Sequence, residues 1–96
     1  MQSAQVKNVA RTIMDGIKDA QMQYNYAVDA KGSGDAELAK LHSAEAAKRL
    51  KGLEEWIAFA AGKFSEKGEE PYAEALLDTY RDWMRDLTGK VMNFKA

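Results

Sequence analysis

The sequence predicts an all-α fold, an antiparallel three-helix bundle with long helices. Helix-breaking residues cluster at only two places, "KGSGD" at 31–35 and "KGEEP" at 67–71. Between these breaks Ala, Leu, Glu, Lys and Met are abundant and β-branched residues are sparse, a composition that favours helix. Apolar residues also recur at steps of three and four, the period of a helix with one buried face. We therefore expect a single helical domain, 1–96, with helices at about 4–31, 35–66 and 71–93.

The first helix carries a heptad stripe of apolar residues, which indicates one packed face. The stripe consists of Val6, Ala10, Ile13, Ile17, Ala20, Tyr24 and Ala27. Gly32, Ser33 and Gly34 can end this helix with a left-handed cap. Ser33 or Asp35 can then cap the second helix by accepting hydrogen bonds from its free N–H groups.

The second helix has a wider apolar surface than two neighbours in a bundle require. Its main stripe consists of Ala39, Ala46, Leu50, Leu53, Ile57, Ala60 and Phe64. At 100° per residue, Leu38 and Trp56 fall ~80° to one side of this stripe. Leu41 and Phe59 fall ~140° away, so the apolar arc is about 200° wide. An unbroken helix of this length spans roughly 48 Å, and a slender rod is hard to stabilise alone. Either the helix breaks near Gly62 or another chain covers its apolar side, and we favour the second.

The third helix begins at a proline, because the missing N–H of Pro71 costs nothing in a first turn. Its apolar residues lie within an arc of ~140°, and its opposite side carries acid–base pairs such as Asp82 with Arg85. The apolar arc consists of Tyr72, Ala73, Leu76, Leu77, Tyr80, Trp83, Met84, Leu87, Val91 and Phe94. We expect Leu87, with Ile17, Leu50 and Leu53 of the other helices, to lie in the core.

Seven residues form the candidate binding surface, which we name the apolar flank. On the second helix, Leu38 and Leu41 form one pair of large side chains, and Trp56 and Phe59 form another. Gly52 lies between these two pairs, where a missing side chain lets another helix approach. Met22 and Tyr26 lie on the outer side of the first helix, and in an antiparallel hairpin they come level with about residues 40–44, beside Leu41. The flank consists of Met22, Tyr26, Leu38, Leu41, Gly52, Trp56 and Phe59. We expect it to bind a second copy across a two-fold axis, giving a dimer, or a larger protein partner. The competing interpretations are that helix 1 or 3 covers it, or that these are ordinary scattered surface residues.

The single histidine, His42, precedes Glu45 by three residues on one helix, a spacing at which both can contact one metal ion. Two ligands are too few, since structural zinc takes four and catalytic zinc three plus water. His42 and Glu45 from each of two chains would supply four, so a metal-binding bundle completed across a dimer is the alternative hypothesis. We expect instead no metal and no cofactor, with His42 at the edge of the core, hydrogen-bonded to Glu45 or to a backbone carbonyl.

Residues 24–50, "YNYAVDAKGSGDAELAKLHSAEAAKRL", resemble the first hairpin of ferritin-like proteins of the rubrerythrin kind. Those proteins also have Tyr and Ala on a first helix, a short turn after Gly and then an apolar helix. That family binds iron through a Glu-x-x-His on the second helix. Matched on apolar spacing, this motif falls on Lys48 and Lys51, which cannot ligate, and His42-x-x-Glu45 has the reverse order. A fourth helix is missing, so the resemblance implies a helical hairpin without the iron site.

Composition excludes several other functions. The chain has no cysteine for a disulfide or a thiolate, and its net charge of −1 includes no basic block for nucleic acid. No apolar run approaches the ~18 residues of a membrane span. No phosphate-binding motif is present, and Ser43 and His42 point ~100° apart, so they form no catalytic dyad. We expect a non-catalytic, cytoplasmic interaction module: a small accessory, adaptor or inhibitor protein, for example from a phage or mobile element.

Overall fold

The computed structural model describes residues 4–66 and 70–96, with the side chains of residues 7–62 and 74–96. The described part of the chain is all-helical and contains no strand. Its elements are α1 (Ala4–Gly32), α2 (Ala36–Glu66) and α3 (Glu70–Asn93). These bounds differ by at most one residue from the expected ranges, and α2 continues without a break through Gly62.

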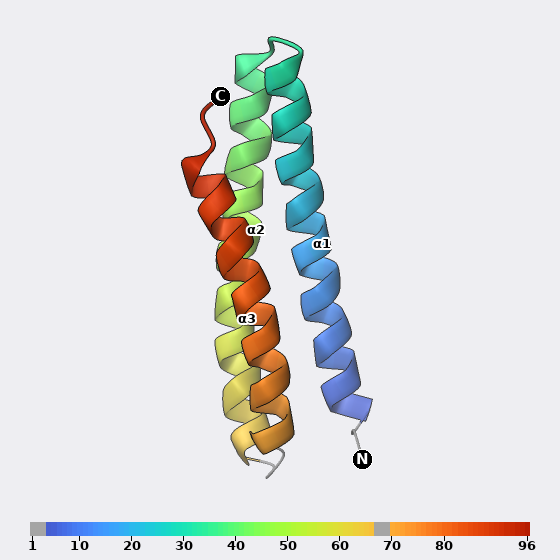
Figure 1. Ribbon diagram of the computed structural model, residues 1–96. Coiled ribbons are helices and arrows are strands. Elements are labelled where there is room, and N and C mark those ends of the chain that lie inside the picture. Colours follow the sequence, from blue (N-terminus) through green and yellow to red (C-terminus); the bar gives the residue numbers. More distant parts are fainter. Residues whose placement is uncertain (1–3, 67–69) are drawn as a thin grey trace.

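The three helices pack side by side into a rod that measures 51 × 19 × 16 Å (Figure 1). Its radius of gyration is 15.4 Å, whereas a compact domain of this length has about 12 to 13 Å. The accessible surface is 6260 Å², against about 5,500 Å² from the usual scaling with mass. The fold therefore has a thin core and more surface than its mass requires.

The core is one continuous apolar cluster along the facing sides of the helices. The four expected core residues, Ile17, Leu50, Leu53 and Leu87, are all buried. The buried cluster consists of Ile13, Ile17, Ala20, Ala46, Leu50, Leu53, Ile57, Ala60, Leu77, Met84, Leu87 and Val91. The stripe members Val6, Phe64, Tyr72 and Ala73 lie outside the residues whose side chains are described.

The exposure of Trp83 differs from the expectation. It belongs to the apolar arc of α3, but its side chain is exposed. The arc of ~140° is wider than the face that α1 and α2 cover, so a residue at its edge remains in contact with water.

The turn between α1 and α2 is closed by a Schellman motif. Gly34 has a φ of 82°, in the left-handed region that glycine adopts without strain. The N–H of Asp35 donates to the carbonyl of Ala30 at 2.9 Å, and the N–H of Gly34 donates to that of Lys31 at 3.0 Å. Asp35 then caps α2, because its Oδ1 accepts from the N–H of Leu38 at 3.0 Å. Of the two predicted caps, the structure selects Asp35 over Ser33.

Asp35→Ala should lower the free energy of unfolding by about 1 kcal/mol, the usual loss when an N-cap acceptor is removed. Ser33→Ala is the matched control, since Ser33 lies in the same turn and its side chain caps neither helix. Urea unfolding followed by circular dichroism measures both variants. Equal losses in the two would show that the turn, and not the cap, sets the stability here.

The end of the rod near this turn consists of two helices only. The turn lies beyond the last turn of α3 (Figure 1), and the buried residues there are alanines: Ala27, Ala30 and Ala39. After α3, the Phe94 ring meets Tyr24 edge-on at 6.0 Å between centroids. Small residues let α1 and α2 approach closely where no third helix contributes to a core.

Gly16 of α1 lies directly against the side chain of Leu53 of α2. A Cβ atom built on Gly16 would clash with Leu53 Cδ2. At Gly52 an added Cβ would meet nothing within 4 Å. Within one chain, therefore, the glycine that admits a neighbouring helix is Gly16, and the space at Gly52 is open.

No helix in the described part of the chain combines the length and apolar character needed to cross a lipid bilayer.

Candidate protein-interaction surface

The apolar flank is largely exposed in the structure. Leu41 is 65% exposed and Phe59 is 61% exposed, values far above those of core side chains. Leu38, Met22 and Tyr26 are each more than two-fifths exposed. Gly52 is exposed as well, whereas Trp56 is partly buried and packs against the core. Neither α1 nor α3 covers this surface, so large apolar side chains remain in water on one side of α2.

The large side chains of α2 on this surface form two pairs. Leu38 and Leu41 lie near the turn, and Trp56 and Phe59 lie 18 residues further along the helix. Eighteen residues are five helical turns, about 27 Å, so both pairs project in the same direction. The Trp56 and Phe59 rings meet edge-on, with centroids 6.0 Å apart and planes at 71°. This contact holds the two rings as one aromatic unit.

Tyr26 of α1 lies near the leucine pair of α2. Its ring lies against His42, with centroids 5.3 Å apart, which places it within the expected stretch 40–44. A hollow of about 330 Å³ separates Tyr26 from Leu38. It is lined by Tyr26, Asp29, Ala30, Ser33, Asp35, Leu38 and His42. The aromatic ring therefore borders Leu38 across this hollow, and Leu41 lies outside it.

Charged residues occupy the surface between the two pairs. Arg49 forms an ion pair with Asp19 of α1, and its Nε donates to Glu45 Oε1 at 3.1 Å. All three side chains are between one-third and one-half exposed, so each pair contributes little to stability. Lys48, also exposed, adds a second base. These four residues, two acids and two bases, sum to no net charge.

His42 has a different partner from the one expected. Its Nδ1 lies 2.8 Å from Oε1 of Gln23, a hydrogen bond between α2 and α1. The expectation of a bond to Glu45 or to a backbone carbonyl is therefore wrong. Glu45 is held by Arg49 one turn further along α2, and Gln23 is supplied by the neighbouring helix, which the pattern of a single helix does not reveal.

The described residues contain no group of three or more His, Asp or Glu side chains placed to hold a metal ion. A site made from His42 and Glu45 of two chains would have to compete with Arg49 for the Glu45 carboxylate.

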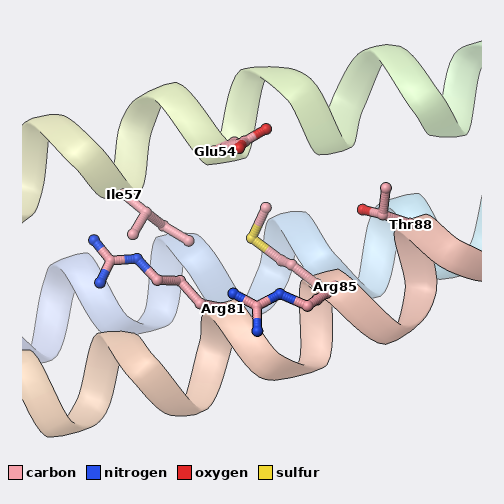
Figure 2. Close-up of a pocket in the computed structure, with 6 residues that line it drawn as sticks. Glu54, Ile57, Arg81, Arg85 and Thr88 are labelled. Carbon is pink, nitrogen blue, oxygen red and sulfur yellow. The ribbon is translucent and has the colours of Figure 1, made fainter.

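A groove of about 360 Å³ runs between α2 and α3 (Figure 2). Glu54 lies on the α2 side of this groove, and Arg81, Arg85 and Thr88 lie on the α3 side. Its lining consists of Glu54, Ile57, Arg81, Met84, Arg85 and Thr88. The described residues that line this groove include no histidine.

The arginines of this groove pair with acids on their own helix. Arg81 Nη1 lies 3.2 Å from Asp78 Oδ1, and Arg85 Nη1 lies 3.9 Å from Asp82 Oδ1. Both pairs are exposed and three residues apart, as on an ordinary helix surface. The groove is therefore a weaker candidate for a site than the apolar flank.

Sequence reasoning missed the helix-to-helix partners Asp19 and Gln23. They are four residues apart on α1, and both contact α2, through Arg49 and His42. Gln23 lies about 40° beyond the edge of the apolar stripe of α1, and Asp19 lies a further ~40° out, so only their spacing of one turn was a signal for such contacts. Val28, Trp83 and Met92 are further exposed apolar side chains, outside the flank.

No protein family model, no curated protein and no solved structure matches this chain. The resemblance of residues 24–50 to a rubrerythrin hairpin therefore rests on the pattern of those residues alone.

Proposed function

We propose that this chain is a non-catalytic protein-interaction module that acts through its apolar flank and binds a second copy of itself there. The observation that carries the proposal is the exposure of Leu41 and Phe59, with their neighbours, beside a core that is already filled by the opposite side of α2. Clustered apolar and aromatic side chains of this kind anchor protein interfaces. The exposed surface of the rod, larger than its mass requires, also supports burial against another chain.

An antiparallel order of neighbouring helices is part of this proposal. Asp19 pairs with Arg49, and Gln23, further along α1, pairs with His42, which is earlier on α2. Contacts in which one residue number rises as the other falls support a hairpin of opposed helices. Such a hairpin presents the flank as one elongated surface of α1 and α2.

A small accessory, adaptor or inhibitor protein fits this arrangement, since such a protein needs one binding surface and no catalytic centre. A cytoplasmic site of action is also proposed, and the absence of cysteine from the sequence supports it.

Sedimentation of wild-type protein against the double variant Leu41→Lys, Phe59→Lys tests the proposal. We expect a two-chain mass for the wild type at tens of micromolar and a one-chain mass for the variant. Both residues are exposed in the single chain, so the variant should keep its helix content by circular dichroism. Trp56 is left intact because it also packs against the core.

The matched control is Val28→Lys with Met92→Lys, which adds the same charge at exposed apolar positions outside the flank. It should sediment like the wild type. A wild type that sediments as one chain, or a flank variant that remains dimeric, would overturn the proposed function.

A further inference from the structure

A basic hollow of about 740 Å³ lies between the last turns of α1 and α3. The chain after α3 runs on toward the turn between α1 and α2 (Figure 1), and it completes the wall of this hollow. The charged residues of the lining are Lys31, Arg85, Lys90, Lys95 and Asp86. Four cations against one carboxylate give the lining a net charge of +3, in a chain whose net charge is −1. We propose that this hollow binds a small soluble molecule that carries several adjacent phosphate groups.

Aromatic contacts hold the cations of two helices around the one hollow. The Phe94 ring meets Tyr24 of α1 edge-on, which ties the segment after α3 to α1. Lys31 Nζ lies 5.5 Å from the centre of the same Phe94 ring, at a cation–π distance. Lys31 is thereby placed beside the cations of α3 by an aromatic ring and not by a carboxylate.

Neighbouring acids neutralise little of this positive charge. Lys90 Nζ lies 3.5 Å from Asp86 Oδ2, and both side chains are more than half exposed. Arg85 Nη1 lies 3.9 Å from Asp82 Oδ1, and both of these side chains are about four-fifths exposed. Such exposed pairs hold their partners weakly. The cations of the hollow are therefore available to an anion from solution.

The helix dipole explains only part of this cluster. Lys31 and Lys90 lie in the last turns of α1 and α3, where a cation offsets the partial negative charge of a helix end. Lys95 follows the end of α3 at Asn93 directly. The effect falls off within one turn, and Arg85 lies eight residues before Asn93. Arg85 therefore has no role at a helix end, and its presence in the lining indicates that charge converges on the hollow itself.

Phosphate groups suit this lining better than carboxylates. Three of its four cations are lysines, which bind phosphate as point charges and lack the planar fork with which arginine holds a carboxylate. The cations come from α1, from α3 and from the segment after it, so a ligand with several adjacent charges can contact more than one of them. The volume of about 740 Å³ is within the range of about 300–1,000 Å³ that is typical of small-molecule sites.

A small anion also suits the chain better than an extended anionic surface. Because the whole chain has a net charge of −1 and the lining +3, the residues outside the lining sum to −4. A lipid bilayer or a nucleic acid would meet that negative charge as well and be repelled by it, whereas a small molecule contacts the hollow alone. The described lining includes no residue of α2, so this proposal does not rest on the proposed function.

Isothermal titration calorimetry with inorganic triphosphate tests the proposal. At about 50 mM salt we expect saturable binding of one triphosphate per chain, and weaker binding at higher salt, which screens the charges. The double variant Lys31→Gln, Arg85→Gln should bind about tenfold more weakly, because two charge-assisted hydrogen-bond donors are lost. Both residues are exposed, so circular dichroism should show unchanged helix content. Citrate, which carries carboxylates in place of phosphates, should bind more weakly than triphosphate.

The matched control is Lys48→Gln with Lys51→Gln, which removes the same charge from exposed positions of α2 outside the hollow. It should bind triphosphate like the wild type. A wild type without saturable binding, or an equal loss in the control, would overturn the site. Citrate that binds as tightly as triphosphate would overturn the assignment to phosphates. Co-sedimentation of the chain with phosphatidylcholine vesicles that contain about one-tenth phosphatidylinositol bisphosphate would overturn the assignment to a soluble ligand.

Discussion

Replacing Leu50 by alanine should lower the free energy of unfolding by about 2–5 kcal/mol, and Leu87→Ala should have an effect of the same size. Leu50 is 3% exposed and Leu87 is 1% exposed, and both belong to the continuous apolar cluster. Each substitution removes buried apolar atoms and leaves a cavity. A thin core supplies few neighbours that could move in to fill it.

Thermal and urea unfolding, followed by circular dichroism, measure this loss. Measurements are made at one fixed protein concentration, because association of folded chains adds to apparent stability. For a chain of this size, a loss of 1 kcal/mol lowers the melting temperature by about 4–8 °C. Met92→Ala, at a residue that is 76% exposed, is the control and should melt like the parent. Leucine variants that also melted like the parent would place the two residues outside the core.

The helices could be predicted because local rules determine them. Glycine-rich breaks and one proline mark the ends, and helix-forming residues fill the rest, so α1, α2 and α3 follow from composition and period. The buried residues Leu50 and Leu87 follow from the angular position of each stripe. The cap of α2 could not be decided, because Ser33 and Asp35 both have oxygen atoms at a suitable position in the sequence.

Contacts between helices could not be predicted in the same way. A helical projection gives the direction of a side chain about its own axis, and it does not give the height at which a neighbouring helix passes. The bond of His42 to Gln23 and the pairing of Asp19 with Arg49 both depend on that height. The exposure of Trp83 depends on how far the neighbours reach around α3.

The candidate surface could be predicted only in part, because a helical projection gives the direction of a side chain but not what it contacts. The width of the apolar arc indicated that Leu38, Leu41 and Phe59 would lie away from the core, and they are exposed. Trp56 was assigned to the same surface, but its large ring reaches back to the core and is partly buried. Angle alone does not show how far a long side chain extends along the surface of its own helix.

The two mid-helix glycines should respond in opposite directions to a larger residue. Gly16→Val should lower the free energy of unfolding by about 1–3 kcal/mol, the usual effect of overpacking. A Cβ there would clash with Leu53 Cδ2, and the two methyl groups of valine add to the clash between α1 and α2. Gly52→Ala should instead raise the free energy of unfolding by roughly 0.5–1 kcal/mol. Alanine restricts the unfolded chain, and its Cβ meets nothing within 4 Å in the fold.

Urea unfolding of both variants, at the same protein concentration, checks the prediction. Gly89→Ala on α3 is the control for Gly52→Ala, since an added Cβ also meets open space there and the position lies outside the flank. At a protein concentration where the wild type sediments as one chain, the two alanine variants should gain similar stability. If Gly16→Val were as stable as the parent, α1 and α2 would not approach closely at this point. The helices α1 and α2 would then pack against each other in a different register, and the flank that they form together would change.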